Sequence, residues 1–200
     1  MVPTVILFDL GGVLVDFAGY RRLESILQGP IDADELRVRW LSSAAVREFE
    51  LGRLTPENFA DRFVEEWSLP MNGSEFLSEF REWPRGLYPG VAALLAAVSV
   101  QARLACLSNS NATHWPVLSG MLGDCFEHQF VSHQLGLAKP DPAVFDLVKG
   151  ELKAEGSEIL FLDDAEPNVA AAEACGLRSE VVRGPRELVL CLDSYGLSTG

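Results

Sequence analysis

The stretch Val5-Ile6-Leu7-Phe8-Asp9-Leu10-Gly11-Gly12-Val13-Leu14-Val15-Asp16 decides the fold of this chain. Its first four residues are apolar without polar alternation, which is typical of a strand buried on both faces of a parallel sheet. Gly11 and Gly12 predict a turn after that strand, so we expect Asp9 at its carboxyl end. In open α/β sheets, ligands bind at the carboxyl ends of the strands. Asp9 is therefore a candidate functional residue, with an ordinary turn or cap role as the alternative.

The composition is that of an ordinary globular protein. The chain has 200 residues, of which 48% are hydrophobic and 22% are charged. This length fits one domain, with or without a small insertion. The net charge of −13 argues against nucleic acid or an anionic membrane as a partner. An acidic chain that binds an anion needs local positive charge, from a cation or from the amino end of a helix.

The four cysteines, Cys106, Cys125, Cys175 and Cys191, lack the short spacing of a metal site. They are interpreted as buried free thiols in a reducing compartment. No apolar run approaches the length of a membrane span, and the amino-terminal segment lacks the basic start of a secretory signal. We therefore expect a cytoplasmic protein.

Residues 17–84 have a helical character that interrupts the strand pattern. Their large apolar residues recur at helical spacing, as in the series Phe59, Phe63 and Trp67. Thr55-Pro56 is typical of a helix start, with Thr as N-cap and Pro as the first helical residue. These patterns predict about four short helices in a small domain inserted after the first strand, with the aromatic rings in its core. Residues 1–16 and 85–200 would form the other domain.

Beyond residue 88, apolar strands alternate with helices. Residues 103–107 and 159–162 are predicted strands, and shorter ones are expected at 130–132 and 181–182. Asp141-Pro142 is typical of the start of one intervening helix. This repetition predicts an α/β fold, with a doubly wound, Rossmann-like parallel sheet and right-handed crossovers.

Polar residues follow three of the predicted strands at the point where each strand ends. Asp9 follows the first, Ser108-Asn109 the second and Asp163-Asp164 the third, while Lys139 precedes a helix. Each has a structural explanation by itself, as a helix cap or as a solvated surface charge. Because the carboxyl ends of parallel strands meet at one edge of the sheet, we expect these groups to converge. Their combination favours a functional site.

In order and spacing, these motifs resemble the four motifs of the haloacid dehalogenase-like (HAD) hydrolase superfamily. The matching residues are 8–14, 107–109, 139–142 and 161–164. The helical insertion is similar to the type-1 cap of that superfamily. Residues 50–59 resemble the cap of a subgroup that includes bacterial sugar-phosphate phosphatases, and the amino-terminal phosphatase domain of soluble epoxide hydrolase is of a related type.

The resemblance implies a magnesium-dependent phosphomonoester hydrolase that acts through an aspartyl-phosphate on a small phosphorylated metabolite, such as a sugar phosphate. Asp9 would be the nucleophile, and Lys139 would be a catalytic cation that also contacts the phosphoryl oxygens. Ser108 and Asn109 would bind the substrate. The implied Mg²⁺ ligands are Asp9, the carbonyl of Gly11, Asp164, and Asp163 as a ligand or as the partner of one. The implied assembly is a monomer or a homodimer.

Gly11 departs from the phosphatase pattern. Phosphatases of this type usually carry an Asp two places after the nucleophile, as acid for the leaving group and base for water. Losing such a group typically slows a reaction by about 10²–10⁴-fold. A substrate with a good leaving group, such as a sugar 1-phosphate, is the preferred explanation. A metal-independent 2-haloacid dehalogenase and a poorly catalytic protein that binds a phosphorylated ligand or a partner are the alternatives. His114 is a candidate replacement acid, although a structural role is expected for it.

Overall fold

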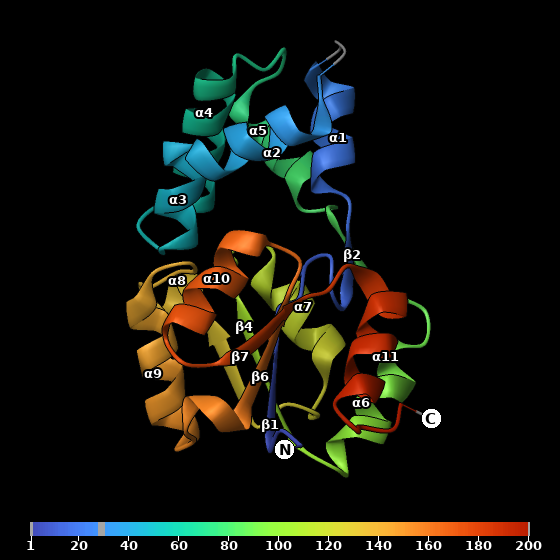
Figure 1. The fold of residues 1–200 in the computed structure, drawn as a ribbon. Helices are drawn as coiled ribbons and strands as arrows, with labels where there is room; N and C mark the ends of the chain where they lie inside the picture. Colours follow the sequence, from blue (N-terminus) through green and yellow to red (C-terminus); the bar gives the residue numbers. More distant parts are fainter. Residues whose placement is uncertain (1, 28–30, 200) are drawn as a thin grey trace.

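Five parallel strands form the centre of the larger part of the molecule, which lies at the bottom of Figure 1. The computed structural model describes residues 2–27 and 31–199. The strand order is β5-β4-β1-β6-β7. Their bounds are β1 Val5–Phe8, β4 Arg103–Ser108, β5 His128–Val131, β6 Ile159–Asp163 and β7 Arg178–Val181. The predicted doubly wound parallel sheet is confirmed.

Helices cover both faces of this sheet. Ile6 and Phe8 of β1 pack in one hydrophobic cluster with residues of α6 (Val91–Ser99), α7 (Trp115–Leu122) and α11 (Gly184–Ser194). Val5 and Leu7 pack in another, with residues of α9 (Pro142–Leu152) and α10 (Glu166–Ala174). Because side chains alternate along a strand, one unbroken apolar run fills both layers. Burial on both faces therefore explains the apolar pattern of β1.

Five helices form the smaller part of the molecule, where the sequence predicted about four (Figure 1). They are α1 Gly19–Leu27, α2 Ala33–Ser42, α3 Ala44–Glu50, α4 Pro56–Trp67 and α5 Gly73–Phe80. Their aromatic rings meet in one cluster, in which Phe63 stacks on both Trp67 and Phe76. The predicted start of α4 is confirmed, because the Thr55 side chain accepts a hydrogen bond from Asn58 N. We call these five helices the cap.

An antiparallel ribbon joins the cap to the sheet, and it was not predicted. It consists of β2 (Val15–Phe17) and β3 (Pro84–Leu87). Asp16 lies within β2 and forms ion pairs with Arg21 and Arg85. Strands of three and four residues are too short to give a clear alternation in the sequence. We propose that the boundary between the two domains runs through this ribbon, near residues 16–17 and 84–85.

Other local predictions are confirmed with small shifts. Residues 130–132 were expected as a strand, but β5 ends at Val131 and Ser132 begins the short helix α8 (Ser132–Leu135). A 3-10 helix, η1 (Gly156–Glu158), precedes β6. All four cysteines are free thiols, but only Cys106 is buried and Cys125 is exposed, so the expectation of uniform burial was wrong. Among the described residues, no helix combines the length and hydropathy that a membrane span requires.

Candidate active site

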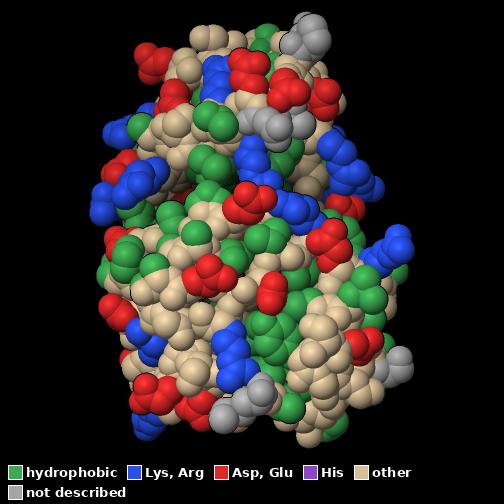
Figure 2. Space-filling view, in the orientation of Figure 1, with side chains coloured by type: hydrophobic (Ala, Val, Ile, Leu, Met, Phe, Trp, Pro, Cys, Tyr) green, Lys and Arg blue, Asp and Glu red, His purple; other side chains and the backbone are tan. Residues whose placement is uncertain are grey.

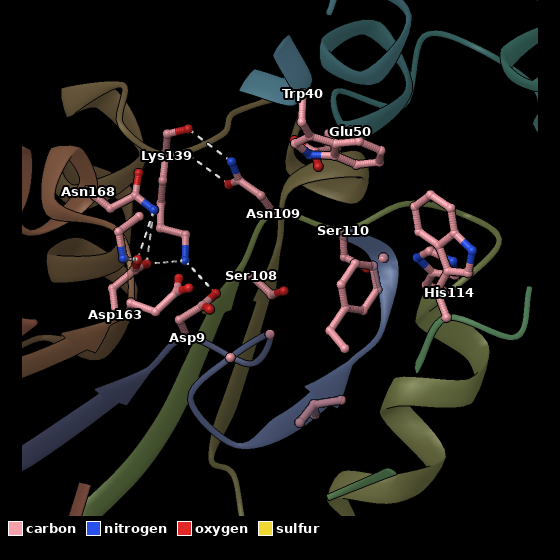
Figure 3. A pocket seen from close by; sticks show the side chains of 18 of the residues that line it. Asp9, Trp40, Glu50, Ser108, Asn109, Ser110, His114, Lys139, Asp163 and Asn168 are labelled. Carbon is pink, nitrogen blue, oxygen red and sulfur yellow. Dashed lines mark hydrogen bonds and ion pairs between the residues drawn. The ribbon is translucent and has the colours of Figure 1, made fainter. Parts of the chain in front are cut away.

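The polar residues at the strand ends converge on one pocket between the sheet and the cap. Asp9, Ser108-Asn109, Lys139 and Asp163-Asp164 all line it, as the sequence predicted. The pocket has a volume of about 230 Å³. Figure 3 shows Asp9, Ser108 and Asp163 on the sheet side, with Trp40 and Glu50 on the cap side. The site therefore combines groups from both parts of the molecule.

Lys139 is the centre of the hydrogen-bond network. Its Nζ donates to Asp9 Oδ1, Asp163 Oδ2 and the Leu107 carbonyl, each at 2.7 Å (Figure 3). The Lys139 side chain is only 1% exposed. Although burial acts to lower it, the pKa of Lys139 is raised by Asp163 and Asp9. The residue is thus a fixed positive charge beneath the pocket.

Both carboxylate oxygens of Asp163 are already engaged. Oδ2 accepts from Lys139, and Oδ1 accepts from Ala165 N at 2.8 Å. Asn168 Nδ2 bridges the two oxygens at 3.0 and 3.1 Å. Asp163 therefore links Lys139 to the segment that leads into α10. Asn168 was not recognised in the sequence as part of the site.

The Asn109 side chain makes two hydrogen bonds to the main chain of Lys139. Its Nδ2 donates to the Lys139 carbonyl, and its Oδ1 accepts from Lys139 N, both at 2.9 Å. These two bonds engage both polar atoms of the side-chain amide, which the sequence had assigned to substrate binding, and each atom keeps the capacity for one more hydrogen bond. Ser108, the last residue of β4, is buried and lines the pocket.

The turn after β1 brings Asp164 next to the backbone of Gly12. Gly12 has φ +78°, and a Cβ atom there would lie 2.9 Å from Asp164 Oδ2. A side chain at this position would therefore be strained and would crowd the carboxylate. Arg37 of α2 approaches the same Oδ2 atom, with its Nη2 at 3.6 Å. This cap arginine was also missed in the sequence.

The charges around Asp9 suit a divalent cation. Oxygen atoms of Asp9, Asp163 and Asp164 lie within 4.8 Å of one another. Burial raises the pKa of Asp9 to about 7, and Lys139 opposes this rise while Asp163 and Asp164 add to it. Burial also raises the pKa of Asp164. An all-oxygen donor set with excess negative charge fits Mg²⁺, and Asp9 and Asp164 have the less engaged carboxylates.

The cap side of the pocket contains side chains that the sequence did not identify. Tyr20 comes from α1, Arg37, Trp40 and Leu41 come from α2, and Glu50 ends α3. Burial raises the pKa of Glu50 to about 7; Lys139 acts to lower it and Asp9 to raise it. On the face seen in Figure 2, Lys and Arg side chains gather on the cap and near its junction with the core. Arg37 of the cap lines the pocket itself, where its charge lies beside Asp164.

His114 has the structural role that was expected of it. Its Nε2 lies 2.7 Å from the Phe80 carbonyl, and its Nδ1 lies 3.3 Å from Asn111 Nδ2. These partners define a neutral ring that donates from Nε2 and accepts at Nδ1. Burial lowers the pKa of His114 to about 4. The ring therefore has no proton to exchange with a ligand near neutral pH.

Arg21 and Arg22 are surface charges. They pair with Asp16 and Glu79. His128 and His133 are outside the residues that line the pocket. The site thus depends on the strand-end residues and on the cap side chains above them.

The geometry belongs to a known class of hydrolases. The profile of the haloacid dehalogenase-like hydrolase family matches residues 3–176, so this chain belongs to that family. The chain is 27% identical to D-ribitol-5-phosphate phosphatase from Bacteroides thetaiotaomicron, over 87% of this chain and 89% of that relative. It is also 27% identical to sesquiterpene phosphatase astK from Aspergillus oryzae, over 86% of this chain and 85% of that relative.

Solved structures share the fold. A HAD family enzyme from Bacteroides thetaiotaomicron, in complex with magnesium and inorganic phosphate, has a TM-score of 0.73 at 21% identity, covering 90% of this chain and 94% of its own. An L-2-haloacid dehalogenase from Xanthobacter autotrophicus, with chloropropionic acid covalently bound, has a TM-score of 0.65 at 21% identity, covering 99% and 85%. The two similarities establish a common fold.

Proposed function

We propose that this chain is a magnesium-dependent phosphomonoester hydrolase that acts through an aspartyl-phosphate at Asp9. One observation carries the proposal: the Asp9 carboxylate is held by Lys139 at 2.7 Å at the base of the pocket, next to Asp163 and Asp164. Lys139 fixes one oxygen of Asp9, which leaves Oδ2 to attack phosphorus. A covalent intermediate divides one difficult hydrolysis into two easier steps.

The proposed chemistry requires positive charge, because a carboxylate approaching a phosphate dianion is repelled. Lys139 would attract the phosphoryl oxygens while it orients Asp9. Asp163, Asn168 and Asn109 would act by holding Lys139 in place, since their polar atoms are bound to it or to each other. Ser108 would bind a phosphoryl oxygen from the end of β4.

Mg²⁺ would be held by the carboxylates of Asp9 and Asp164 and by the Gly11 carbonyl. When bound, it would neutralise charge on the phosphoryl group and on the two carboxylates. Asp163 is assigned to Lys139 rather than to the metal, because both of its oxygens already accept hydrogen bonds. Arg37 supplies a cap-borne positive charge at Asp164.

The proposed substrate is a small phosphorylated metabolite, such as a sugar phosphate. The pocket volume of about 230 Å³ lies below the ≈300–1,000 Å³ usual for drug-sized ligands. Trp40 and Trp83 provide apolar walls, and Tyr20 and Glu50 provide polar groups on the cap side. By their names, the two relatives act on a polyol phosphate and on a terpenoid phosphate. The proposal therefore does not restrict the alcohol that leaves from the phosphate ester.

A panel of phosphomonoesters, with and without Mg²⁺, tests this function. The panel should include sugar 1-phosphates, alkyl phosphates and an acyl phosphate, with phosphate release as the readout. The proposal expects release that requires Mg²⁺ and disappears in Asp9→Asn. Robust release of halide from 2-haloacids in the presence of a chelator would overturn it in favour of a dehalogenase. Binding of phosphate analogues without turnover of any ester would favour a ligand-binding protein.

A further inference from the structure

The proposed reaction leaves one proton without a source. When Asp9 attacks phosphorus, the leaving oxygen departs as a strongly basic alkoxide unless an acid protonates it. A base must later take a proton from the water that hydrolyses the aspartyl-phosphate. Gly11, two residues after Asp9, has no side chain to perform either task. Another side chain of the pocket must therefore carry this proton.

Three titratable side chains line the pocket among the described residues, besides the groups assigned above: Tyr20, Glu50 and His114. His114 is excluded because both ring nitrogens have partners and the pKa is lowered to about 4. Burial raises the pKa of Tyr20 to about 12, which makes its phenol a weak acid. Glu50 is the remaining group.

Glu50 is positioned by the way in which α3 packs. Phe49 is buried in the aromatic cluster of the cap, so the next residue around the helix is turned out of that cluster. Glu50 lines the pocket on its cap side, across from Asp9 (Figure 3). Among the residues whose side chains the structure describes, none makes a hydrogen bond or ion pair with its carboxylate.

The turn after α3 fixes this position relative to the sheet. Gly52 has φ +72°, and a Cβ atom built on it would collide with the carbonyl oxygen of His133 in α8. The missing side chain thus lets the cap backbone rest directly on the core, two residues after Glu50. Figure 1 shows α3 lying above α8 at this point. Glu50 therefore faces Asp9 only while Gly52 of the cap is in contact with α8.

We propose that Glu50 is the general acid and base of this site, delivered by the cap in place of the side chain that Gly11 lacks. The inference rests on the proposed function. Nucleophile and leaving oxygen lie on opposite sides of phosphorus in an in-line displacement. Asp9 below and Glu50 above match that arrangement, with the phosphoryl group between them.

With Glu50 as the proton carrier, protons and electrons balance in both the formation and the hydrolysis of the aspartyl-phosphate. In the first step, Asp9 Oδ2 bonds to phosphorus, the bond to the leaving oxygen breaks with its electron pair, and protonated Glu50 gives that oxygen its proton. In the second step, the Glu50 carboxylate takes a proton from water as the water oxygen bonds to phosphorus. The bond to Asp9 then breaks, its electrons return to the carboxylate, and inorganic phosphate leaves. Glu50 is protonated again, ready for the next substrate.

The environment of Glu50 allows both protonation states near neutral pH. Burial raises its pKa to about 7, which suits a group that must both give and take a proton. The charged and titratable groups that face it come from the cap and from the core. They are Tyr20, Arg37, Asp9, Lys139 and, beside the Gly52 turn, His133.

Glu50→Gln tests the inference through two leaving groups. With an alkyl phosphate, the variant should lose about 10²–10⁴-fold in kcat, because both steps lack their proton carrier. With p-nitrophenyl phosphate, the first step needs no acid, so nitrophenol should appear in a burst of one equivalent per site before slow turnover. The fall in wild-type kcat above neutral pH should also be absent from the variant. Equal turnover of both esters by variant and wild type, without a burst, would overturn the role of Glu50.

Three further variants distinguish a failure of the Glu50 role from a failure of the proposed function. Glu48→Gln changes a carboxylate on the same helix that pairs with Arg53 outside the site, and it should behave as wild type. Asp9→Asn reports on the proposed function: if it still releases phosphate, that function fails and the inference fails with it. If Asp9→Asn is inactive while Glu50→Gln is fully active, only the role of Glu50 is refuted. Glu50→Asp should recover part of the lost kcat, since the carboxylate remains.

Discussion

Replacing Lys139 by Met should destabilise the fold strongly. The Nζ atom makes three contacts of 2.7 Å, two of them to the carboxylates of Asp9 and Asp163. Met keeps the length of the side chain and its packing near Phe161. The variant therefore removes the charge and little volume. What remains is two carboxylates and the Leu107 carbonyl without their common donor.

Removing one partner of a buried ion pair costs about 3–5 kcal/mol, because a buried charge is left unpaired. The side chains of Lys139 and Asp163 are each 1% exposed and that of Asp9 is 11% exposed, so water provides little compensation. We therefore expect a loss of about 3–5 kcal/mol near neutral pH without divalent cations. With an m value of about 2 kcal/mol/M, this loss lowers the urea midpoint by about 1.5–2.5 M.

Urea unfolding followed by circular dichroism measures this loss, and Lys149→Met is the matched control. Lys149 pairs with Asp146 at the surface, where an ion pair contributes at most about 1 kcal/mol. Acidification should reduce the loss in Lys139→Met, because protonation neutralises the stranded carboxyls. A loss of less than about 1 kcal/mol in Lys139→Met, equal to that of the control, would refute the reasoning from buried charge.

Glu50→Gln should stabilise the protein near pH 8 by roughly 1–3 kcal/mol and should have little effect near pH 4. The pKa of Glu50 is raised in the folded state, so the unfolded state releases this proton at a lower pH. The stability of the wild type therefore falls as the pH rises from about 4.5 to about 7. Thermal melts across this pH range would show the effect, and a pH-independent difference would contradict it. Gly52→Ala should lose about 1–2 kcal/mol from its positive φ, and the collision with His133 should also lower kcat. Gly150→Ala is the control in the same melts and assays, because the space around its Cβ position is open. Equal behaviour of the two variants would contradict the idea that the contact between Gly52 and His133 positions the cap. Mg²⁺ should stabilise the wild type and raise its thermal midpoint. At a concentration of 100 Kd the free energy of unfolding should increase by about 2.7 kcal/mol, and Asp164→Asn should abolish most of this gain.

The strand-end residues could be predicted because their positions follow from local patterns and from one rule of topology. Apolar runs identify β1, β4 and β6, and parallel pairing brings their ends together. Asp9, Ser108 and Asp163 were located in this way. No long-range information was needed beyond the alternation of strands and helices.

The cap side of the site could not be predicted, because it depends on how two separately packed parts meet. Glu50 follows a buried Phe in a short helix, and the role proposed for it depends on the contact of Gly52 with α8. Arg37 likewise acquires a partner from the far end of the chain, Asp164. No periodicity in the sequence encodes such contacts.

The use of Asn109 was also beyond sequence reasoning. An amide next to a strand end is equally suited to bind a ligand or a backbone, and its two bonds to Lys139 appear only in three dimensions. The ribbon of β2 and β3 was missed because its strands are too short for a pattern. The sequence therefore predicts the strand-end residues of the site better than its cap side.

The central claim is that Asp9 becomes covalently phosphorylated during turnover. The most direct test is acid quenching of the enzyme during steady-state hydrolysis of a substrate with a radiolabelled phosphoryl group, followed by peptide mapping. Label on the peptide that contains Asp9, present with Mg²⁺ and absent in Asp9→Asn, is the predicted result. Turnover of the substrate without label on that peptide, or label that persists in Asp9→Asn, would contradict the account.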